Sequence, residues 1–264
     1  AKGYNGLDPI WIGKGHSTAD GINVLAKFSD EIKSDDISGK LDLIVSCHTF
    51  EHVPSPLESL KRISELCNDN ADFFIEVPSM ETLIELNRID QVFHQHVNYF
   101  SVYSMTELFK QVGFSFIRNT FNYNMWGGTM ILHFKKGTHQ SNNENKKILP
   151  KEFKDSYSRF KTQVEAFEEQ ILKLDNVCYY GAAQMLPALL YHLKNEDLSK
   201  IKIYDDNENR IGLKYPNSKL HIHKPPKDLS DYSVVITALD SYRPIMKKLL
   251  SLNPRRIVDF LNTK

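Results

Sequence analysis

Residues 41–47, which read LDLIVSC, form a short and almost continuous apolar run. A buried strand of a parallel sheet has this pattern, because both of its faces are covered. A second apolar run, DFFIEV at residues 72–77, ends at Pro78. Between the two runs, apolar residues recur at helical spacing after two prolines, namely at Leu57, Leu60, Ile63 and Leu66. The strand, the helix and the second strand predict a βαβ unit.

Further elements follow along the chain. The pattern predicts a helix that Ser104 caps and Gly113 ends, then strands at residues 114–117 and 129–134. Residues 137–147 contain no apolar side chain and are rich in turn-forming residues, so they form the predicted linker. A long amphipathic helix is predicted at residues 151–173.

A second alternation of strands and helices occupies the rest of the chain. We predict strands at residues 176–180, 201–204, 233–238 and 256–260, with a helix at 185–193. Alternation of this kind is typical of a parallel sheet. The sequence therefore predicts an α/β protein with a first domain at residues 1–136, a linker and long helix at 137–175, and a smaller Rossmann-like domain at 176–264.

The composition excludes several classes of protein. The chain has 264 residues, is 41% hydrophobic and carries 33 basic and 33 acidic residues, so its formal net charge is zero. This balance gives no reason to expect a nucleic-acid partner or a membrane surface. The three cysteines, Cys47, Cys67 and Cys178, lie far apart, which favours reduced thiols in a cytoplasmic protein. No apolar run approaches the length of a membrane span.

The first candidate site follows the first apolar run. Residues 48–52 read HTFEH, so polar side chains emerge at the carboxyl end of a strand, where ligands of open α/β sheets bind. The same residues match H-x-x-E-H, a zinc-peptidase signature that would use His48, Glu51 and His52. That signature needs a helix, whereas a strand precedes these residues and Pro54 follows them. We therefore predict no metal site and keep a zinc hydrolase as an alternative.

The second candidate site is the segment FHQHVNYF at residues 93–100. Histidine has an unperturbed pKa of about 6.5, so it can accept and return a proton near neutral pH. In an extended segment, His94 and His96 would lie on the same side. The segment is either an acid/base site or a partly buried loop with inert histidines, and its proximity to His52 decides between the two.

Two further motifs have both a functional and a structural interpretation. Asp8 follows an early strand and could bind the ribose of a nucleoside, or it could be a turn residue before proline. Gly127 and Gly128 precede a strand and allow either close approach to a ligand or a tight turn. Residues 181–183, Gly-Ala-Ala, are only half of a dinucleotide-binding motif.

In the order of these motifs, the chain resembles the sugar C-methyltransferase family. Members of that family use S-adenosylmethionine to methylate a nucleotide-linked keto-deoxysugar. The residues that carry the resemblance are Gly6 to Pro9, Phe28 and Ser29, residues 41–54, Ile75 to Pro78, residues 93–101, and Gly127 with Gly128. The second domain resembles the family's C-terminal Rossmann-like domain through Tyr180 to Ala182 and the pair Asp205 and Asp206. The resemblance implies a methyltransferase domain whose zinc-binding region and glycine-rich cofactor loop lie before residue 1.

The resemblance also implies roles for individual residues. Asp8 would bind the cofactor ribose, Phe28 and Ser29 would lie along the adenine, and His48 would border the methionine end. His96 would be the general base and His52 a second active-site histidine. Substrate-binding residues would be Tyr99, Asn124, Gly127 and Gly128. The family has tyrosine and glutamate where this chain has Phe93 and Gln95, so these two active-site positions differ from those of its relatives.

The expected chemistry is the deprotonation of a carbon next to a carbonyl, followed by transfer of the sulfonium methyl group. S-adenosylmethionine is the expected cofactor, and the expected partner is a small molecule, most simply a nucleotide-linked sugar. The alternatives are a relative that methylates oxygen or nitrogen, a non-catalytic relative, and the zinc hydrolase. The sequence leaves the oligomeric state open.

Overall fold

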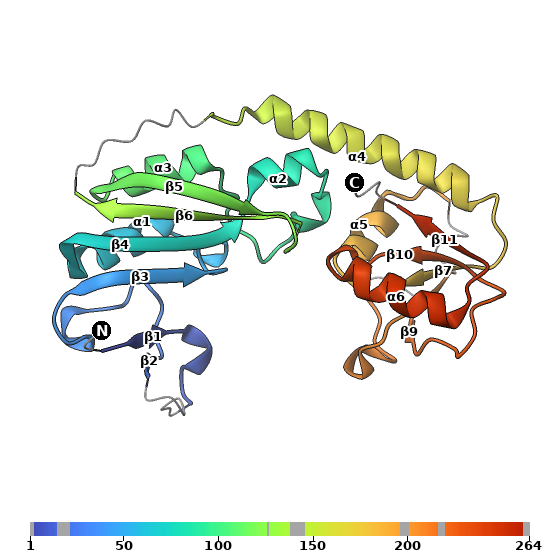
Figure 1. Cartoon of the computed structure of the whole chain (residues 1–264), viewed down its shortest axis with the longest axis horizontal. Coiled ribbons are helices and arrows are strands. Elements are labelled where there is room, and N and C mark those ends of the chain that lie inside the picture. The colour runs from blue at the N-terminus through green and yellow to red at the C-terminus, as the bar shows by residue number, and fades with distance from the viewer. Residues whose placement is uncertain are drawn as a thin grey trace. The chain divides into compact units, whose positions relative to one another are not determined.

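The computed structural model describes residues 3–14, 22–125, 127–137, 146–195, 201–215 and 220–260 (Figure 1). The chain forms two compact units. Unit 1 consists of Ala1–Met80, His94–Asn122 and Thr129–Ile148, and unit 2 consists of Glu81–Phe93, Tyr123–Gly128 and Leu149–Lys264. Glu81–Phe93 and Tyr123–Gly128, which lie within the predicted first domain, thus belong to unit 2. The boundaries of the functional domains stay predictions. Residues 138–145 of the predicted linker lie outside the described residues.

Unit 1 is built on a four-stranded sheet with the order β3-β4-β6-β5. Strands β3 (Leu41–Cys47) and β4 (Cys67–Pro78) are parallel, whereas β6 (Thr129–Lys136) is antiparallel to β4 and to β5 (Phe114–Asn122). Helix α1 (Pro56–Leu66) connects β3 to β4, so the predicted βαβ unit is confirmed. Strands β1 (Asn5–Leu7) and β2 (Asn23–Leu25) form a separate parallel pair.

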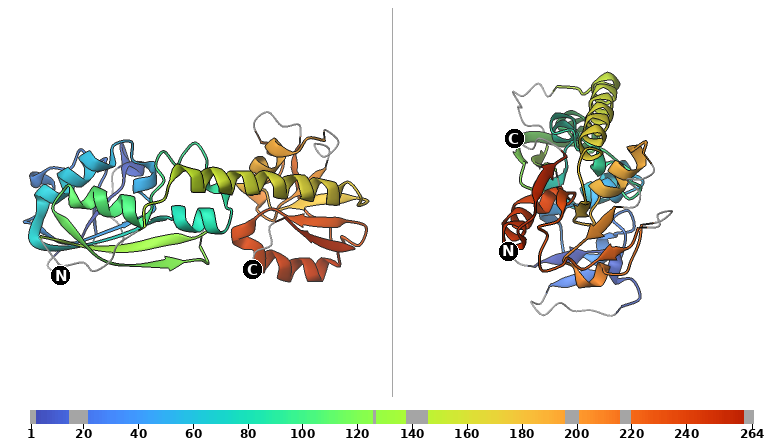
Figure 2. Two further views of the ribbon diagram at one scale, coloured as in Figure 1. Left: turned by 90° about the horizontal axis from the view of Figure 1, so that it is seen from above. Right: turned by 90° about the vertical axis from the view of Figure 1, so that its right-hand side faces the viewer.

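One face of the unit 1 sheet carries the hydrophobic core. Helices α1 and α3 (Val102–Lys110) both cover this face (Figures 1 and 2). The rings of Phe73 in β4 and Phe109 in α3 meet edge to face, with centroids 4.9 Å apart. On β3, Leu43 and Val45 are 57% and 64% exposed. The prediction that both faces of this strand are buried is therefore wrong for unit 1 as described, because the helices lie on one face only.

The helix boundaries follow local hydrogen bonding. Helix α1 begins with Pro56, whose missing N–H costs nothing in the first turn. The N-cap of α3 is Ser101, whose side chain accepts from the Ser104 N–H while the Ser104 hydroxyl accepts from the Ser101 N–H. The predicted cap at Ser104 is therefore wrong by three residues, because Ser104 is the reciprocal member of the capping box.

Unit 2 contains a five-stranded sheet in which every neighbouring pair is parallel, as predicted. Its order is β11-β10-β7-β8-β9, with β7 at Val177–Tyr180, β8 at Lys202–Tyr204, β9 at Ile222–His223, β10 at Ser233–Ile236 and β11 at Arg256–Asp259. The helices are α2 (Met80–Glu85), which starts at the last residue of unit 1, α4 (Pro150–Ile171), α5 (Met185–His192) and α6 (Tyr242–Leu252).

Helices pack on both faces of the unit 2 sheet (Figure 2). Ile245 and Leu249 of α6 pack against Tyr180 and Ile236 on one face. On the other side, Phe160 of α4 meets the ring of Phe260, which follows β11, with centroids 5.9 Å apart. Both units are therefore α/β, and the predicted fold class is confirmed.

Short 3₁₀ segments complete the structure at Pro9–Trp11, Ser34–Asp36, Phe50–His52, Ile89–Gln91, Glu208–Arg210 and Leu239–Ser241. Among the described residues, none of the helices has the length and apolar character that crossing a bilayer requires.

Candidate active site

The candidate site of unit 1 begins where β3 ends. His48, the next residue, has a backbone φ of +48°, and its N–H donates to the Glu76 carbonyl of β4 at 2.9 Å. A non-glycine residue in the left-handed region costs roughly 1–2 kcal/mol. This strained turn leads directly into the 3₁₀ segment Phe50–His52, so the polar side chains of residues 48–52 gather at the carboxyl end of the strand.

Backbone hydrogen bonds hold the histidine segment against this turn. The N–H groups of Val97 and Asn98 both donate to the Glu51 carbonyl, at 2.9 and 3.1 Å. The Asn98 amide also donates to the carbonyls of Val53 at 2.6 Å and Phe50 at 3.2 Å. Three donors thus join two segments that lie more than forty residues apart in sequence.

His52 and His96 consequently lie side by side. Their ring centroids are 5.1 Å apart, and the ring of Tyr99 is 6.3 Å from that of His96. His96 is buried, with 7% of its surface exposed, whereas the His52 side chain is 43% exposed. The proximity that the sequence analysis required for an acid/base site is therefore present.

The other residues of the segment have different surroundings. His94 and Gln95 form a turn and are exposed, so His94 and His96 do not share one side. That prediction is wrong because the segment is not extended. The Gln95 carbonyl accepts a hydrogen bond from His52 Nδ1 at 2.8 Å, a contact that involves no side-chain atom of Gln95. Phe93 is half-buried and belongs to unit 2.

Glu51 was named from the sequence only in the zinc-hydrolase alternative, and it had no predicted role in methyl transfer. Its side chain is only 2% exposed, although it carries a carboxylate. Oε1 lies 3.3 Å from His48 Nδ1 and 3.9 Å from His52 Nε2, whereas Oε2 is buried without a hydrogen-bond partner in the described structure. The hydrogen bond to Glu51 raises the pKa of His48, against an opposing effect of burial. The signal for Glu51 was its place between two histidines after a strand.

The predicted cofactor residues also lie in unit 1. Asp8 follows β1, is exposed, and accepts from the Ile10 N–H at 3.0 Å, which caps the 3₁₀ segment Pro9–Trp11. Phe28 is 53% exposed, and the Ser29 hydroxyl donates to the Ser59 hydroxyl at 2.9 Å. Their contacts with adenosine stay predictions.

Three of the predicted substrate-binding residues belong to unit 2. Gly127 and Gly128 have φ values of +71° and +108°, which favour glycine. A Cβ on Gly127 would lie 2.8 Å from Nη1 of Arg88, and one on Gly128 would overlap the Thr82 side chain. Close packing alone accounts for both glycines, and Asn124 is exposed. A substrate contact at these positions stays a prediction.

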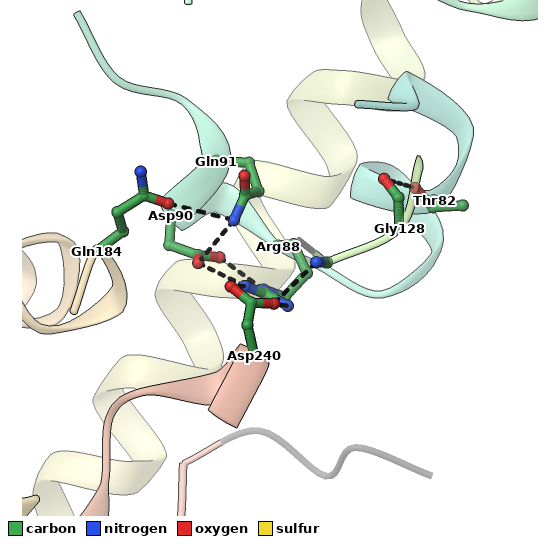
Figure 3. Close-up of polar contacts among 8 residues, drawn as sticks. Thr82, Arg88, Asp90, Gln91, Gly128, Gln184 and Asp240 are labelled. Atoms are coloured by element: carbon green, nitrogen blue, oxygen red, sulfur yellow. Dashed lines mark hydrogen bonds and ion pairs between the residues drawn. The ribbon is translucent and has the colours of Figure 1, made fainter. Parts of the chain in front are cut away.

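A buried ion-pair network surrounds the glycines (Figure 3). Arg88 donates from Nε and Nη2 to both oxygens of Asp90, each at 2.8 Å, and the Gly127 N–H donates to Asp240 Oδ1 at 2.9 Å. Gln91 Nε2 donates to Asp90 at 3.3 Å and to Gln184 at 3.4 Å. No periodic pattern in the sequence indicates this network, because Gly127, Gln184 and Asp240 lie far along the chain from residues 88–91.

Unit 2 also has a small cavity of about 290 Å³ beyond the carboxyl ends of β8 and β9. Asp205 at its wall accepts from the Ala182 N–H at 2.7 Å and from Arg210 Nη1 at 3.3 Å. Asp206 accepts from the Tyr180 hydroxyl at 2.9 Å. Asp205 therefore stabilises the turn after β7, and Asp206 holds the Tyr180 hydroxyl, so contacts within the protein account for both residues.

Comparison with known proteins identifies relatives of the first part of the chain. Residues 4–119 match the family model of a methyltransferase domain. This match agrees with the predicted methyltransferase domain, and such a domain implies S-adenosylmethionine as the cofactor. Over 130 residues the chain is 28% identical to the C-methyltransferase NovU of Streptomyces niveus, which covers 48% of this chain. The chain spans only 31% of the length of that protein.

Solved methyltransferase structures show a distant similarity. One is the N-methyltransferase NodS from Bradyrhizobium japonicum WM9 in complex with S-adenosyl-L-homocysteine, with a TM-score of 0.38, 10% identity, and coverage of 51% of this chain and 67% of that chain. Another is the 1,6-didemethyltoxoflavin-N1-methyltransferase from Burkholderia thailandensis, with a TM-score of 0.37, 14% identity, and coverage of 51% and 61%.

Proposed function

We propose that the protein transfers the methyl group of S-adenosylmethionine to a carbon atom of a small molecule, and that this acceptor is a nucleotide-linked keto-deoxysugar. The match of residues 4–119 to a methyltransferase domain supports the reaction type, and the similarity to a C-methyltransferase supports carbon as the acceptor. The single observation that carries the proposal is the buried His96 next to His52 at the end of the unit 1 sheet.

The proposed role of His96 follows from the acidity of the acceptor. A carbon next to a ketone becomes a nucleophile only after it loses a proton, so a base must lie beside it. The imidazole of His96 takes this proton and becomes an imidazolium. S-adenosylmethionine, when bound, would supply an electrophilic methyl group for this carbon, with cleavage of its sulfur–methyl bond and release of S-adenosylhomocysteine.

The imidazolium needs a negative charge nearby. The family that this chain resembles has a glutamate in the histidine segment, at the position of Gln95. Gln95 is neutral and cannot supply that charge. The carboxylate of Glu51 lies within 4.8 Å of a ring nitrogen of His96. We assign to Glu51 the stabilisation of protonated His96, so the charge comes from the neighbouring segment rather than from the histidine segment itself.

Negative charge on the ketone oxygen also needs hydrogen-bond donors. Tyr99 and His52 flank His96 and carry groups of the required kind. Because a carbonyl oxygen can only accept, His52 Nδ1 donates to Gln95, and His52 Nε2 becomes a donor only when the ring is protonated. The hydroxyl of Tyr99 is the other candidate donor, and it does not depend on protonation of His52.

The test separates proton removal from methyl transfer. The protein is incubated in D₂O with a nucleotide-linked keto-deoxysugar, with and without S-adenosylmethionine, and deuterium and methyl incorporation are followed by NMR. Wild-type protein should incorporate deuterium at the carbon beside the ketone and then the methyl group. His96→Gln should lower both by about 10²- to 10⁴-fold.

His94→Gln is the matched control, because His94 is an exposed imidazole of the same segment. It should retain both activities. A methyl group found on oxygen or nitrogen would contradict the carbon assignment. Full deuterium incorporation by His96→Gln would remove His96 from the role of base.

A further inference from the structure

The side chains of Glu51, His52 and His96 form a convergent donor set in the described part of unit 1. One potential ligand atom from each residue lies within 4.8 Å of the other two. This set differs from the H-x-x-E-H alternative, which used His48 and required a helix, whereas residues 50–52 form a 3₁₀ segment. We propose that Glu51, His52 and His96 form a binding site for a divalent transition-metal ion of the zinc class.

The chemistry of the donors selects the metal. Two imidazoles and one carboxylate suit zinc and its neighbours in the first transition row, whereas magnesium and calcium prefer oxygen donors alone. Three protein ligands leave a fourth tetrahedral position for water or another small ligand. Because the His52 side chain is 43% exposed, solvent can reach this position.

The orientation of His52 matches that of a metal ligand. Its Nδ1 donates to the Gln95 carbonyl at 2.8 Å, which leaves the lone pair of a neutral ring on Nε2. A metal-binding histidine commonly donates its other N–H to a carbonyl or carboxylate in this way, which fixes the tautomer and the ring. Nε2 is the atom that faces Glu51, at 3.9 Å from Oε1.

Glu51 supplies an independent reason for a cation. Its carboxylate is 2% exposed, and Oε2 has no hydrogen-bond partner among the described residues. A buried charged oxygen without a partner is costly, and coordination to a cation removes that cost. His48 Nδ1 contacts the other oxygen, Oε1, at 3.3 Å, as an outer hydrogen-bond partner does in metal sites.

The three donor atoms must move closer together to coordinate one metal ion. Ligand atoms bound tetrahedrally to zinc lie about 3.3–3.6 Å from one another, given metal–ligand distances of about 2.0–2.2 Å. The distance between Glu51 Oε1 and His52 Nε2 is 3.9 Å, and one ligand atom from each of the three residues lies within 4.8 Å of the others, so side-chain adjustment on metal binding closes the remaining gaps. The backbone of Glu51 is already held by the N–H groups of Val97 and Asn98.

Metal binding does not depend on the proposed function, but one consequence rests on it. A metal ion on His96 occupies the lone pair that the general base needs, so bound zinc should block proton removal. Zinc binding at this site and turnover of the keto-sugar therefore exclude each other.

The test measures metal binding directly. Zinc is titrated calorimetrically into the untagged protein, and cobalt(II) is used as a probe because a tetrahedral site gives it visible absorption bands. Wild-type protein should bind one zinc at this site, and His52→Ala should weaken the affinity by at least about 10- to 100-fold and abolish the cobalt bands. His94→Ala should bind as the wild type does.

His52→Ala is the main variant because its side chain is partly exposed, so folding should survive, as circular dichroism will show. Glu51→Gln and His96→Ala should have the same effect if they fold. Equal zinc affinity in wild type and His52→Ala, or no cobalt band in the wild type, would overturn the metal site. Loss of deuterium incorporation on adding zinc supports the exclusion, whereas zinc binding with full deuterium incorporation would instead contradict His96 as the base.

Discussion

Arg88 and Asp240 are 152 positions apart in the sequence, yet they form a two-point ion pair within unit 2. Nη1 of Arg88 donates to Oδ1 of Asp240 at 3.0 Å, and Nη2 donates to Oδ2 at 3.2 Å. Burial alone would lower the pKa of the guanidinium, but the hydrogen bonds and charges of Asp90 and Asp240 raise it. This pair holds the loop before the histidine segment to the C-terminal half of the chain.

Removal of Arg88 should destabilise unit 2 strongly. Asp90 is only 4% exposed, so Arg88→Met leaves a buried carboxylate without its partner, which typically costs about 3–5 kcal/mol. Urea denaturation measures this loss. Lys61→Met is the control, because the Lys61–Glu58 pair is exposed and should contribute at most about 1 kcal/mol. Equal costs for the two variants would show that the buried network does not stabilise the unit.

Asp8 should contribute to cofactor affinity through its charge. A hydrogen bond to a charged group contributes about 1.5–3 kcal/mol, so Asp8→Ala should weaken binding of S-adenosylhomocysteine by about 10- to 100-fold in calorimetry. The same carboxylate caps the segment Pro9–Trp11. Asp8→Asn separates the two roles, because asparagine also caps well but carries no charge. Unchanged affinity in Asp8→Ala would remove the residue from the cofactor site.

The three cysteines should differ widely in reactivity. Cys47 is exposed, although partial burial and the charge of Glu76 raise its pKa above the usual value. Burial raises the pKa of Cys67 to about 11 and that of Cys178 to about 12. Thiolate is the reactive form, so at pH 8 a disulfide reagent should label one thiol quickly and the other two at least about 100-fold more slowly. Unfolding in denaturant should release all three. Cys47→Ser should remove the fast phase, and its persistence would contradict the assignment.

The stability of unit 1 should depend on the charge of Asp72. A hydrogen bond from His133 Nε2 at 2.7 Å, together with the charge of Lys135, lowers the pKa of Asp72 below its usual value of 3.8, against an opposing effect of burial. A lowered folded-state pKa means that the stabilisation is complete above the unfolded value and is lost as pH falls through the folded value.

Asp72→Asn should therefore cost up to about 1 kcal/mol at pH 7 and nothing below about pH 2, as followed by urea denaturation across pH. Asp69→Asn, an exposed aspartate of the same strand, is the control and should show no such pH dependence. A cost for Asp72→Asn that stays constant down to pH 2 would contradict the role of the carboxylate charge.

Local pattern predicted most of the fold. Strand β3 and the long helix α4 were predicted at or within two residues of their observed bounds, because continuous apolar runs and helical spacing are local properties. Helix α6 was not predicted, although Tyr242, Ile245 and Leu249 recur at helical spacing. The exposure of Leu43 depends on which face the helices cover, a tertiary fact that the strand's own residues do not contain.

The candidate site was predicted only in part, because its motifs are local but the contacts between them are not. His52 and His96 could be assigned to one site because each lies in a recognisable motif. In the structure their ring centroids are 5.1 Å apart. The burial of Glu51 and the exposure of His94 were not predictable, because both depend on how the turn at residues 94–95 lies against the loop after β3.

Val97 and Asn98 donate four hydrogen bonds to residues 50–53, and these bonds have a dynamic consequence. Neither loop can open while the other stays in place, so the two should behave as one cooperative unit of local unfolding. Protection of their amide hydrogens from exchange would then rise and fall together, and the positions of the two imidazoles would be preserved or lost in a single step.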